Sequence, residues 1–106
     1  MKENATVKTL LTLEFKENFK KLAEQKGVNA TTYLIDLIEQ DMYKRPRYLN
    51  PYIVDGNQLS SLGIRIPKEL YDKLTIKCKL CNLSLSLYLR MLIYDTVRDN
   101  ANKSIK

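Results

Sequence analysis

Cys78 and Cys81 form a Cys-x-x-Cys spacing, the arrangement in this sequence most typical of thiol or metal chemistry. A structural zinc site normally needs four ligands, and the chain has no His and no further Cys to complete one. A thioredoxin-like dithiol stands at the start of a helix, whereas this pair falls in the middle of a helical apolar pattern. We therefore expect both cysteines to pack in the core, with no metal and no cofactor bound.

Other catalytic chemistry has little support in the sequence. The chain has no His, no glycine-rich phosphate loop and no nucleophile beside a plausible base. Tyr and Asp side chains alone do not define a reaction. We expect that the protein is not an enzyme, and no small-molecule substrate is evident.

The charge of the chain favours a polyanionic partner. Lys and Arg number 18 against 12 acidic residues, a formal net charge of +6, and residues 61–98 are the most basic segment. Such a balance suits nucleic acid or an anionic membrane surface. No run of about 18 apolar residues predicts a membrane-spanning helix, and the polar N-terminus lacks the apolar stretch of a signal peptide. We expect a cytoplasmic protein with no membrane association.

Two segments alternate with a period of two, which predicts half-buried strands. In the first, one face carries Val7, Thr9, Leu11 and Leu13, and the other Thr6, Lys8, Leu10 and Thr12. In the second, one face carries Leu62, Ile64 and Ile66, and the other Ser61, Gly63 and Arg65. Thr12 and Pro67 end the strands, and Pro67 suits the first turn of a helix.

Each predicted strand is followed by two predicted amphipathic helices. The apolar stripes are Phe15, Phe19, Leu22 and Ala23; Leu34, Leu37, Ile38, Asp41 and Met42; Leu70, Leu74, Cys78 and Cys81; and Leu85, Tyr88, Leu89, Leu92, Ile93 and Val97. Lys77 is expected on the polar face of the third helix. Gly27 and Asn82 suit helix ends, and Asn29 and Ser84 suit helix starts. The tyrosines Tyr33, Tyr43, Tyr71, Tyr88 and Tyr94 are expected to pack between helices with hydrated hydroxyls.

Segments 6–43 and 61–98 align without gaps at an offset of 55 residues. Few residues are identical, but the same succession of a strand-like alternation and two helical apolar patterns occurs in both. A single unit of this size buries too little to fold alone. We expect units at 1–43 and 61–98 to pair their strands antiparallel and to share one core of four helices, and the sequence leaves open whether they pair within one chain or across two chains. The predicted fold is mainly α with a two-stranded antiparallel β-ribbon, a basic linker at 44–60 and a polar tail at 99–106.

This order of strand, helix, turn and helix resembles the ribbon–helix–helix family, which includes the Arc and methionine repressors. The second segment carries the resemblance best, in IRIPKEL at 64–70, NLS at 82–84 and Leu89-Arg90. The first segment matches in Leu22-Ala23 and GVN at 27–29 but departs at the strand, where Leu10 replaces the basic residue and Thr12 the proline. Two copies in one chain resemble the TraY-type accessory proteins of plasmid conjugation.

The resemblance implies which residues would contact DNA. In the family, outward strand residues read bases in the major groove, and the N-terminus of the second helix binds phosphate. By position, the base-reading residues are Thr6, Lys8, Leu10, Ser61, Gly63 and Arg65, and the phosphate-binding residues are Asn29, Ala30, Thr31, Ser84, Leu85 and Ser86. Lys44, Arg45 and Arg47 of the linker are further candidates for flanking contacts. Because the two segments differ, we expect an asymmetric pair of half-sites.

The resemblance predicts a sequence-specific double-stranded DNA-binding protein, with transcriptional repression favoured. A relaxosome or plasmid-maintenance accessory role is an alternative, because the fold does not separate it from repression. An antitoxin with a protein partner is another, although only about eight polar residues follow the second segment, where such proteins carry a toxin-binding tail. Self-association on adjacent sites is left open, as is a helical scaffold that binds no nucleic acid.

Overall fold

The computed structural model describes residues 3–44 and 59–104, with side chains through residue 100. Its elements are, in order, β1 (Asn4–Thr12), α1 (Leu13–Gln25), α2 (Ala30–Met42), β2 (Leu59–Pro67), α3 (Lys68–Leu80) and α4 (Leu85–Ser104). The described part is therefore mainly helical, with one two-stranded antiparallel sheet, as predicted. The predictions for linker residues 45–58, including Arg45 and Arg47, lie outside the described residues.

Local chemistry explains where the helices begin and end. The Thr12 hydroxyl accepts from the amide of Phe15 at 3.3 Å, and Asn29 Oδ1 accepts from the amide of Thr32 at 2.7 Å, so both residues cap helix N-termini. The first helix of each pair is followed by a residue with positive φ, +76° at Gly27 and +56° at Asn82. Gly and Asn adopt this left-handed conformation at low cost, which allows the chain to leave the helix and turn sharply.

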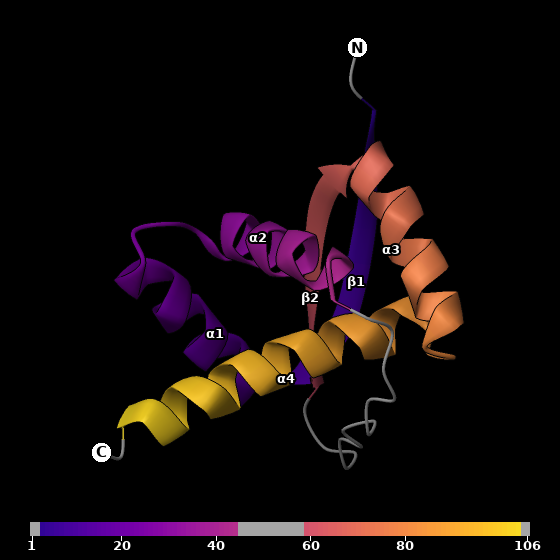
Figure 1. Ribbon diagram of the computed structural model, residues 1–106. Helices are drawn as coiled ribbons and strands as arrows, with labels where there is room; N and C mark the ends of the chain where they lie inside the picture. Colours follow the sequence, from indigo (N-terminus) through magenta and orange to yellow (C-terminus); the bar gives the residue numbers. More distant parts are fainter. Residues whose placement is uncertain (1–2, 45–58, 105–106) are drawn as a thin grey trace.

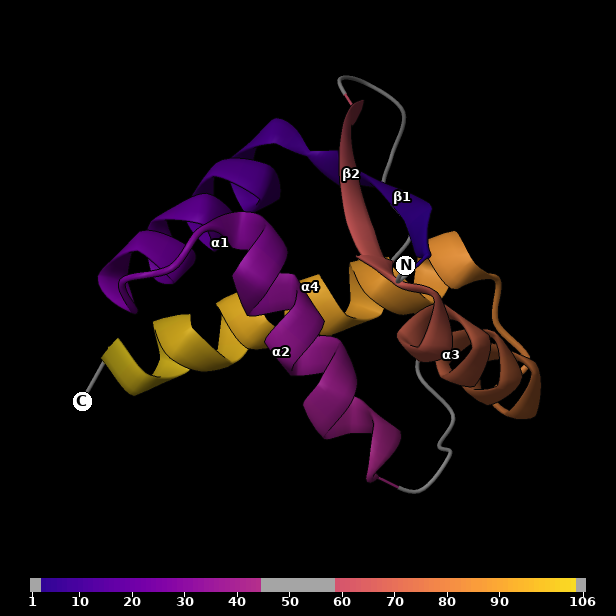
Figure 2. The ribbon, with the colours of Figure 1, turned by 90° about the horizontal axis from the view of Figure 1, so that it is seen from above.

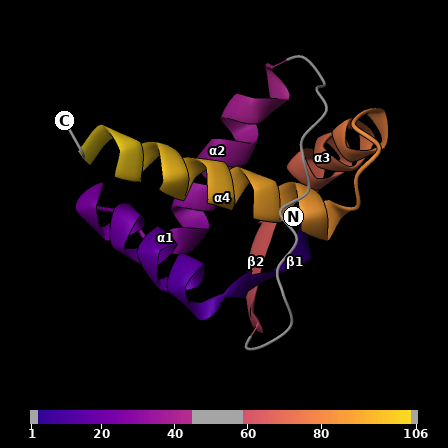
Figure 3. The ribbon, with the colours of Figure 1, turned by 90° about the horizontal axis from the view of Figure 1, so that it is seen from below.

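The two strands form a ribbon along one side of the molecule. They pair over their whole length, from Asn4 opposite Pro67 to Thr12 opposite Leu59. Figure 1 shows the ribbon behind α2 and α4, and the views from above and below show it at the edge of the helical body (Figures 2 and 3). One face of the ribbon therefore covers the helices and the other faces outward.

The core lies between the inner face of the ribbon and the four helices. Every second strand residue is buried: Val7, Thr9, Leu11, Leu62, Ile64 and Ile66. The helices contribute the predicted stripes, with Phe19, Leu34, Leu74, Leu89 and Ile93 almost completely buried. Both cysteines belong to this core, as predicted. The alternation in the sequence thus correctly assigned the inner and outer faces of both strands.

Several side chains depart from the sequence prediction. Leu13 was expected on the inner face of the first strand, but α1 begins at Leu13, and helical geometry turns the side chain outward to 49% exposure. Tyr43 was expected to pack between helices and is 92% exposed, because α2 ends at Met42. The Tyr88 hydroxyl, expected to be hydrated, is buried, and no described group is within hydrogen-bond reach of it.

The position of Lys77 differs most from the predicted division of the helices into polar and apolar faces. It was expected on the polar side of its helix but is only 6% exposed. Its ammonium lies 3.5 Å from Asp41 Oδ2, and it donates to the carbonyl of Asp41 and, at 2.6 Å, to that of Lys44. These carbonyls end α2, where the helix dipole favours a positive charge. Packing of α3 against the end of α2 therefore places Lys77 in the interior.

The strands end at Thr12 and Pro67, as predicted, although Pro67 is the N-cap of α3 rather than a residue of its first turn. One element boundary differs. Helix α4 continues past residue 98 to Ser104, through most of the predicted polar tail. Even so, no helix in the described ranges is long and apolar enough to cross a membrane.

Candidate nucleic-acid interface

All six residues predicted to read bases lie on the outer face of the ribbon and are exposed. They face one another in pairs on alternate rungs: Thr6 with Arg65, Lys8 with Gly63, and Leu10 with Ser61. The side chains of such pairs stand about 5 Å apart on one face of a sheet. The structure therefore brings together, on one surface, residues that are more than fifty positions apart in the chain.

The charge of this surface is positive. Lys8 is the only charged residue of β1, and Arg65 is the only charged residue of β2. The remaining outward side chains on these three rungs are two hydroxyls and one Leu, and Gly63 has none. A surface of this composition carries no carboxylate to repel phosphate and offers donors to base edges.

The centre of the ribbon is occupied by Lys8 alone. A Cβ atom placed on Gly63 would lie 3.5 Å from Lys8 Cγ and 3.8 Å from Lys8 Cε. The aliphatic part of Lys8 therefore crosses the ribbon over the bare backbone of residue 63. This arrangement gives the space beside Gly63 to the Lys8 side chain and covers the backbone at the centre of the outer face.

Two basic side chains of the helices donate hydrogen bonds to the edges of the ribbon. The sequence analysis did not predict either contact. Arg90 Nε in α4 donates to the carbonyl of Leu10 at 2.8 Å. Lys16 Nζ in α1 donates to the carbonyl of Ser61 at 3.0 Å and to Ser60 Oγ at 2.9 Å. Leu10 and Ser61 share one rung, so this end of the ribbon has a cation bound at each edge. Each cation was assigned only to a helix, because nothing local relates it to a distant strand.

The first turn of α4 lies directly against the ribbon. The Thr9 hydroxyl donates to the carbonyl of Ser86 at 2.6 Å, and Ser86 Oγ lies 3.4 Å from Thr9 Oγ1. Ser84 Oγ accepts from the amide of Leu87 at 3.2 Å. The amides of Leu85 and Ser86 precede the first intrahelical hydrogen bond, as at any helix start. The predicted phosphate-binding residues of this helix are thus placed beside β1 by specific hydrogen bonds.

The first turn of α2 is held differently. Asn29 is exposed, and Ala30 and Thr31 are half-buried. With the offset of 55, Ile64 corresponds to Thr9 and Ile35 to Arg90, and neither Ile side chain can donate a hydrogen bond. The polar attachment that joins α4 to β1 therefore has no counterpart of the same chemistry between α2 and β2. The two predicted phosphate sites are not equivalent.

Of the predicted flanking contacts, only Lys44 lies in the described residues. It is exposed just beyond the end of α2, and its carbonyl accepts from the buried Lys77 ammonium. Lys44 is thus fixed through its backbone while its side chain remains outside. Lys44 and the outer face of the ribbon are two separate features of the described surface.

The cysteines are placed for packing rather than for ligation. Burial, together with the nearby Cys81 and Asp41, raises the pKa of Cys78 from 9.0 to about 12. A thiol with so high a pKa is protonated at neutral pH and is a poor nucleophile and ligand. Among the described residues, no group of three or more His, Cys, Asp or Glu side chains is arranged to hold a metal ion.

Comparison with protein-family models, with curated proteins and with solved structures found no match to this chain.

Proposed function

We propose that this chain is a ribbon–helix–helix pseudo-dimer that binds double-stranded DNA sequence-specifically, with the outer face of the β1–β2 ribbon in the major groove. The pairing of Lys8 with Gly63 is the observation that carries this proposal. Paired residues in the ribbon have numbers that sum to 71, and the sequence offset is 55. Lys8 and Gly63 satisfy both relations, since 8 + 63 = 71 and 63 − 8 = 55.

An approximate two-fold axis through the Lys8–Gly63 rung would satisfy both relations. The element bounds support it, because β1, α1 and the start of α2 correspond to β2, α3 and the start of α4 by adding 55. The positive-φ residues Gly27 and Asn82 also differ by 55. DNA has local two-fold symmetry, so a body with such an axis can present equivalent elements to both strands.

The composition of the outer face supports this proposal. A major groove about 12 Å wide admits a two-stranded ribbon. Arg65 is exposed, and a guanidinium can donate two hydrogen bonds to guanine O6 and N7. Thr6 and Ser61 can donate or accept, and Leu10 can contact a thymine methyl group. The helix starts at Asn29 and Ser84 would bind phosphates and fix the register.

Repression is the role we propose for this binding, because a protein bound over a promoter blocks access to it without further activity. Footprinting on the native replicon tests the role. Protection over a promoter supports repression, whereas protection beside a transfer or replication origin supports an accessory role in plasmid transfer or maintenance.

DNA binding itself is tested by fluorescence anisotropy with random and selected duplexes over a range of salt concentrations. About six phosphate contacts predict a slope near −5 for log K against log salt. The double variant Lys8→Ala, Arg65→Ala should weaken binding strongly. Lys21→Ala is a matched control, since Lys21 is exposed near the end of α1 farther from the ribbon. No measurable affinity, or affinity that does not change with salt, would contradict the proposal.

A further inference from the structure

An open cavity of about 820 Å³ lies at the end of the ribbon where β1 begins and β2 ends. Its walls come from the end of α2, from Pro67 where β2 ends, and from the first two turns of α3. Met42 and Leu70 supply apolar surface, and three carboxylates surround it: Glu3, Glu39 and Glu69. Its volume is in the range of sites that hold small organic molecules.

The cavity lies where the two halves of the chain differ in sequence. Glu39 and Leu70 correspond, at the offset of 55, to Tyr94 and Phe15. In that half the two rings pack together, with centroids 5.0 Å apart. In this half a carboxylate and a smaller aliphatic side chain stand at the same positions. The Phe15 and Tyr94 rings therefore have no aromatic counterparts at positions 70 and 39.

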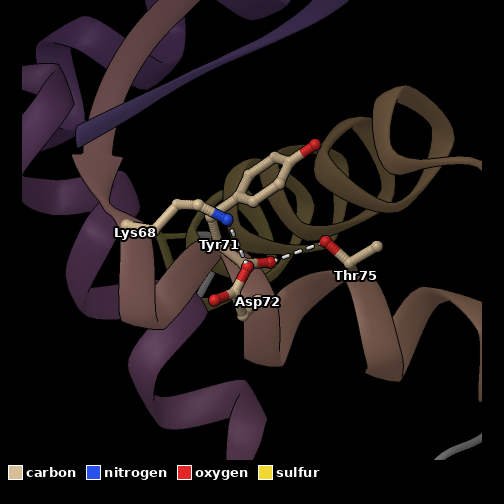
Figure 4. A network of polar contacts seen from close by, with 4 residues as sticks. All are labelled: Lys68, Tyr71, Asp72 and Thr75. Carbon is tan, nitrogen blue, oxygen red and sulfur yellow. Dashed lines mark hydrogen bonds and ion pairs between the residues drawn. The ribbon is translucent and has the colours of Figure 1, made fainter. Parts of the chain in front are cut away.

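The charge around the cavity is negative overall. Two lysines, Lys68 and Lys73, face the three carboxylates. The Lys68 ammonium lies 2.8 Å from Asp72 Oδ1 and 5.4 Å from the centre of the Tyr71 ring (Figure 4). Asp72 is the main reason that the pKa of Lys68 is raised. The described lining therefore carries three carboxylates and two lysines, and one of these lysines also pairs with Asp72.

We propose that this cavity binds a small organic cation that has an ammonium group and an apolar, ring-sized body. The body would occupy the space between Met42 and Leu70 that aromatic rings fill in the other half. The ammonium would donate to the carboxylates of Glu39 and Glu69, since charge-assisted hydrogen bonds are the strongest available there. An anionic ligand of the same shape would be repelled.

The position of the cavity links it to the ribbon. The carbonyl of Glu3, the residue before β1, accepts from the amide of Lys68 at 2.9 Å, and Pro67 ends β2. Carboxylates at this end repel approaching phosphates, and a bound cation would offset them. The cation is therefore expected to increase DNA affinity, and DNA to increase the affinity for the cation by the same factor. This coupling rests on the proposed DNA binding, but the ligand site does not.

The site is tested on the full chain without DNA, with phenethylamine as the probe and phenethyl alcohol and phenylacetate as neutral and anionic controls. The amine should shift the backbone amide resonances around Glu39, Glu69 and Leu70. The alcohol should bind with an affinity at least about tenfold lower than that of the amine. Glu39→Gln with Glu69→Gln should remove the preference for the amine and keep the shape. Equal binding of amine and alcohol, or no binding of either, would overturn the proposal.

A second variant fills the cavity. Glu39→Tyr with Leu70→Phe copies the Phe15–Tyr94 pair and should abolish amine binding in a folded protein, as checked by thermal unfolding. Amine binding that survives this change would contradict the assignment of the site. If the amine binds but does not change DNA affinity, the site is supported and the coupling is contradicted. If the protein does not bind DNA at all, the proposed function is contradicted and the amine site is unaffected.

Discussion

The side chain of Lys8 lies across the ribbon over Gly63, with Lys8 Cγ 3.5 Å from the position that a Cβ on residue 63 would take. This distance is ordinary van der Waals contact, so a small side chain at residue 63 fits without strain. The two residues form the central rung of the exposed face. Substitutions at Gly63 therefore probe the centre of the surface without disturbing the core.

Gly63→Glu is expected to weaken binding to duplex DNA by more than about tenfold, because it places a carboxylate beside Lys8 on the face that would enter the groove of a polyanion. Gly63→Ala is the matched steric control and should change affinity much less. Anisotropy titrations at fixed salt measure both, and circular dichroism checks the fold. Equal affinities for the two variants would mean that this face does not approach DNA.

Arg65→Ala should cost about 1–3 kcal/mol of binding free energy and relax the preference at one base position, because a bidentate contact to guanine would be lost. Arg65→Lys keeps the charge but not the paired donors, so it should retain more affinity than specificity. Selection from a random duplex library measures the preference at each position. A uniform loss on all sequences would instead identify Arg65 as a phosphate contact.

Lys77→Met should destabilise the protein by about 3–5 kcal/mol, since it removes the buried ammonium that lies 3.5 Å from the buried Asp41 carboxylate. Combining it with Asp41→Leu removes both charges and should recover much of that loss. Urea unfolding at neutral pH measures the free energies. If the single variant proved as stable as the double variant, the pair would not be a buried ion pair in solution. Exposed Lys79 on the same helix provides the control, Lys79→Met.

The raised pKa of Cys78 predicts how the free energy of unfolding changes with pH in the alkaline range. Its pKa is raised to about 12 in the folded protein, from 9.0. Between these values the folded state keeps the thiol proton and the unfolded state loses it, so the free energy of unfolding should fall as pH rises above about 9. Cys78→Ala should lose less stability over this range than the natural chain. Parallel pH curves for the two proteins would contradict the assigned pKa.

The strand faces and most of the helix limits could be predicted because they are encoded locally. Alternation at 7–11 and 62–66 separates inner from outer side chains whatever the partner strand is. Thr12 and Asn29 cap helices through neighbours three residues away, and Gly27 and Asn82 provide the left-handed conformation at helix ends. The six outward residues were therefore identified before their pairing was known.

Other features depend on contacts between distant segments. Asp41 was a visible anomaly in an apolar stripe, but its partner Lys77 is 36 residues away and belongs to a polar pattern on its own helix. Arg90 and Lys16 reach the ribbon edges across 80 and 45 residues, respectively. Periodicity carries no information about such pairs, because it reports only which side of an element faces the core.

The sequence by itself determined the order of strands and helices, the face that each strand buries and the basic character of the exposed one. Only the tertiary structure decided that Thr6 opposes Arg65, that Lys8 crosses Gly63, and that Lys77 is interior. The physical reason is that backbone preference and amphipathic period act within a few residues of chain. Strand register and the burial of a charge are set by packing over the whole core.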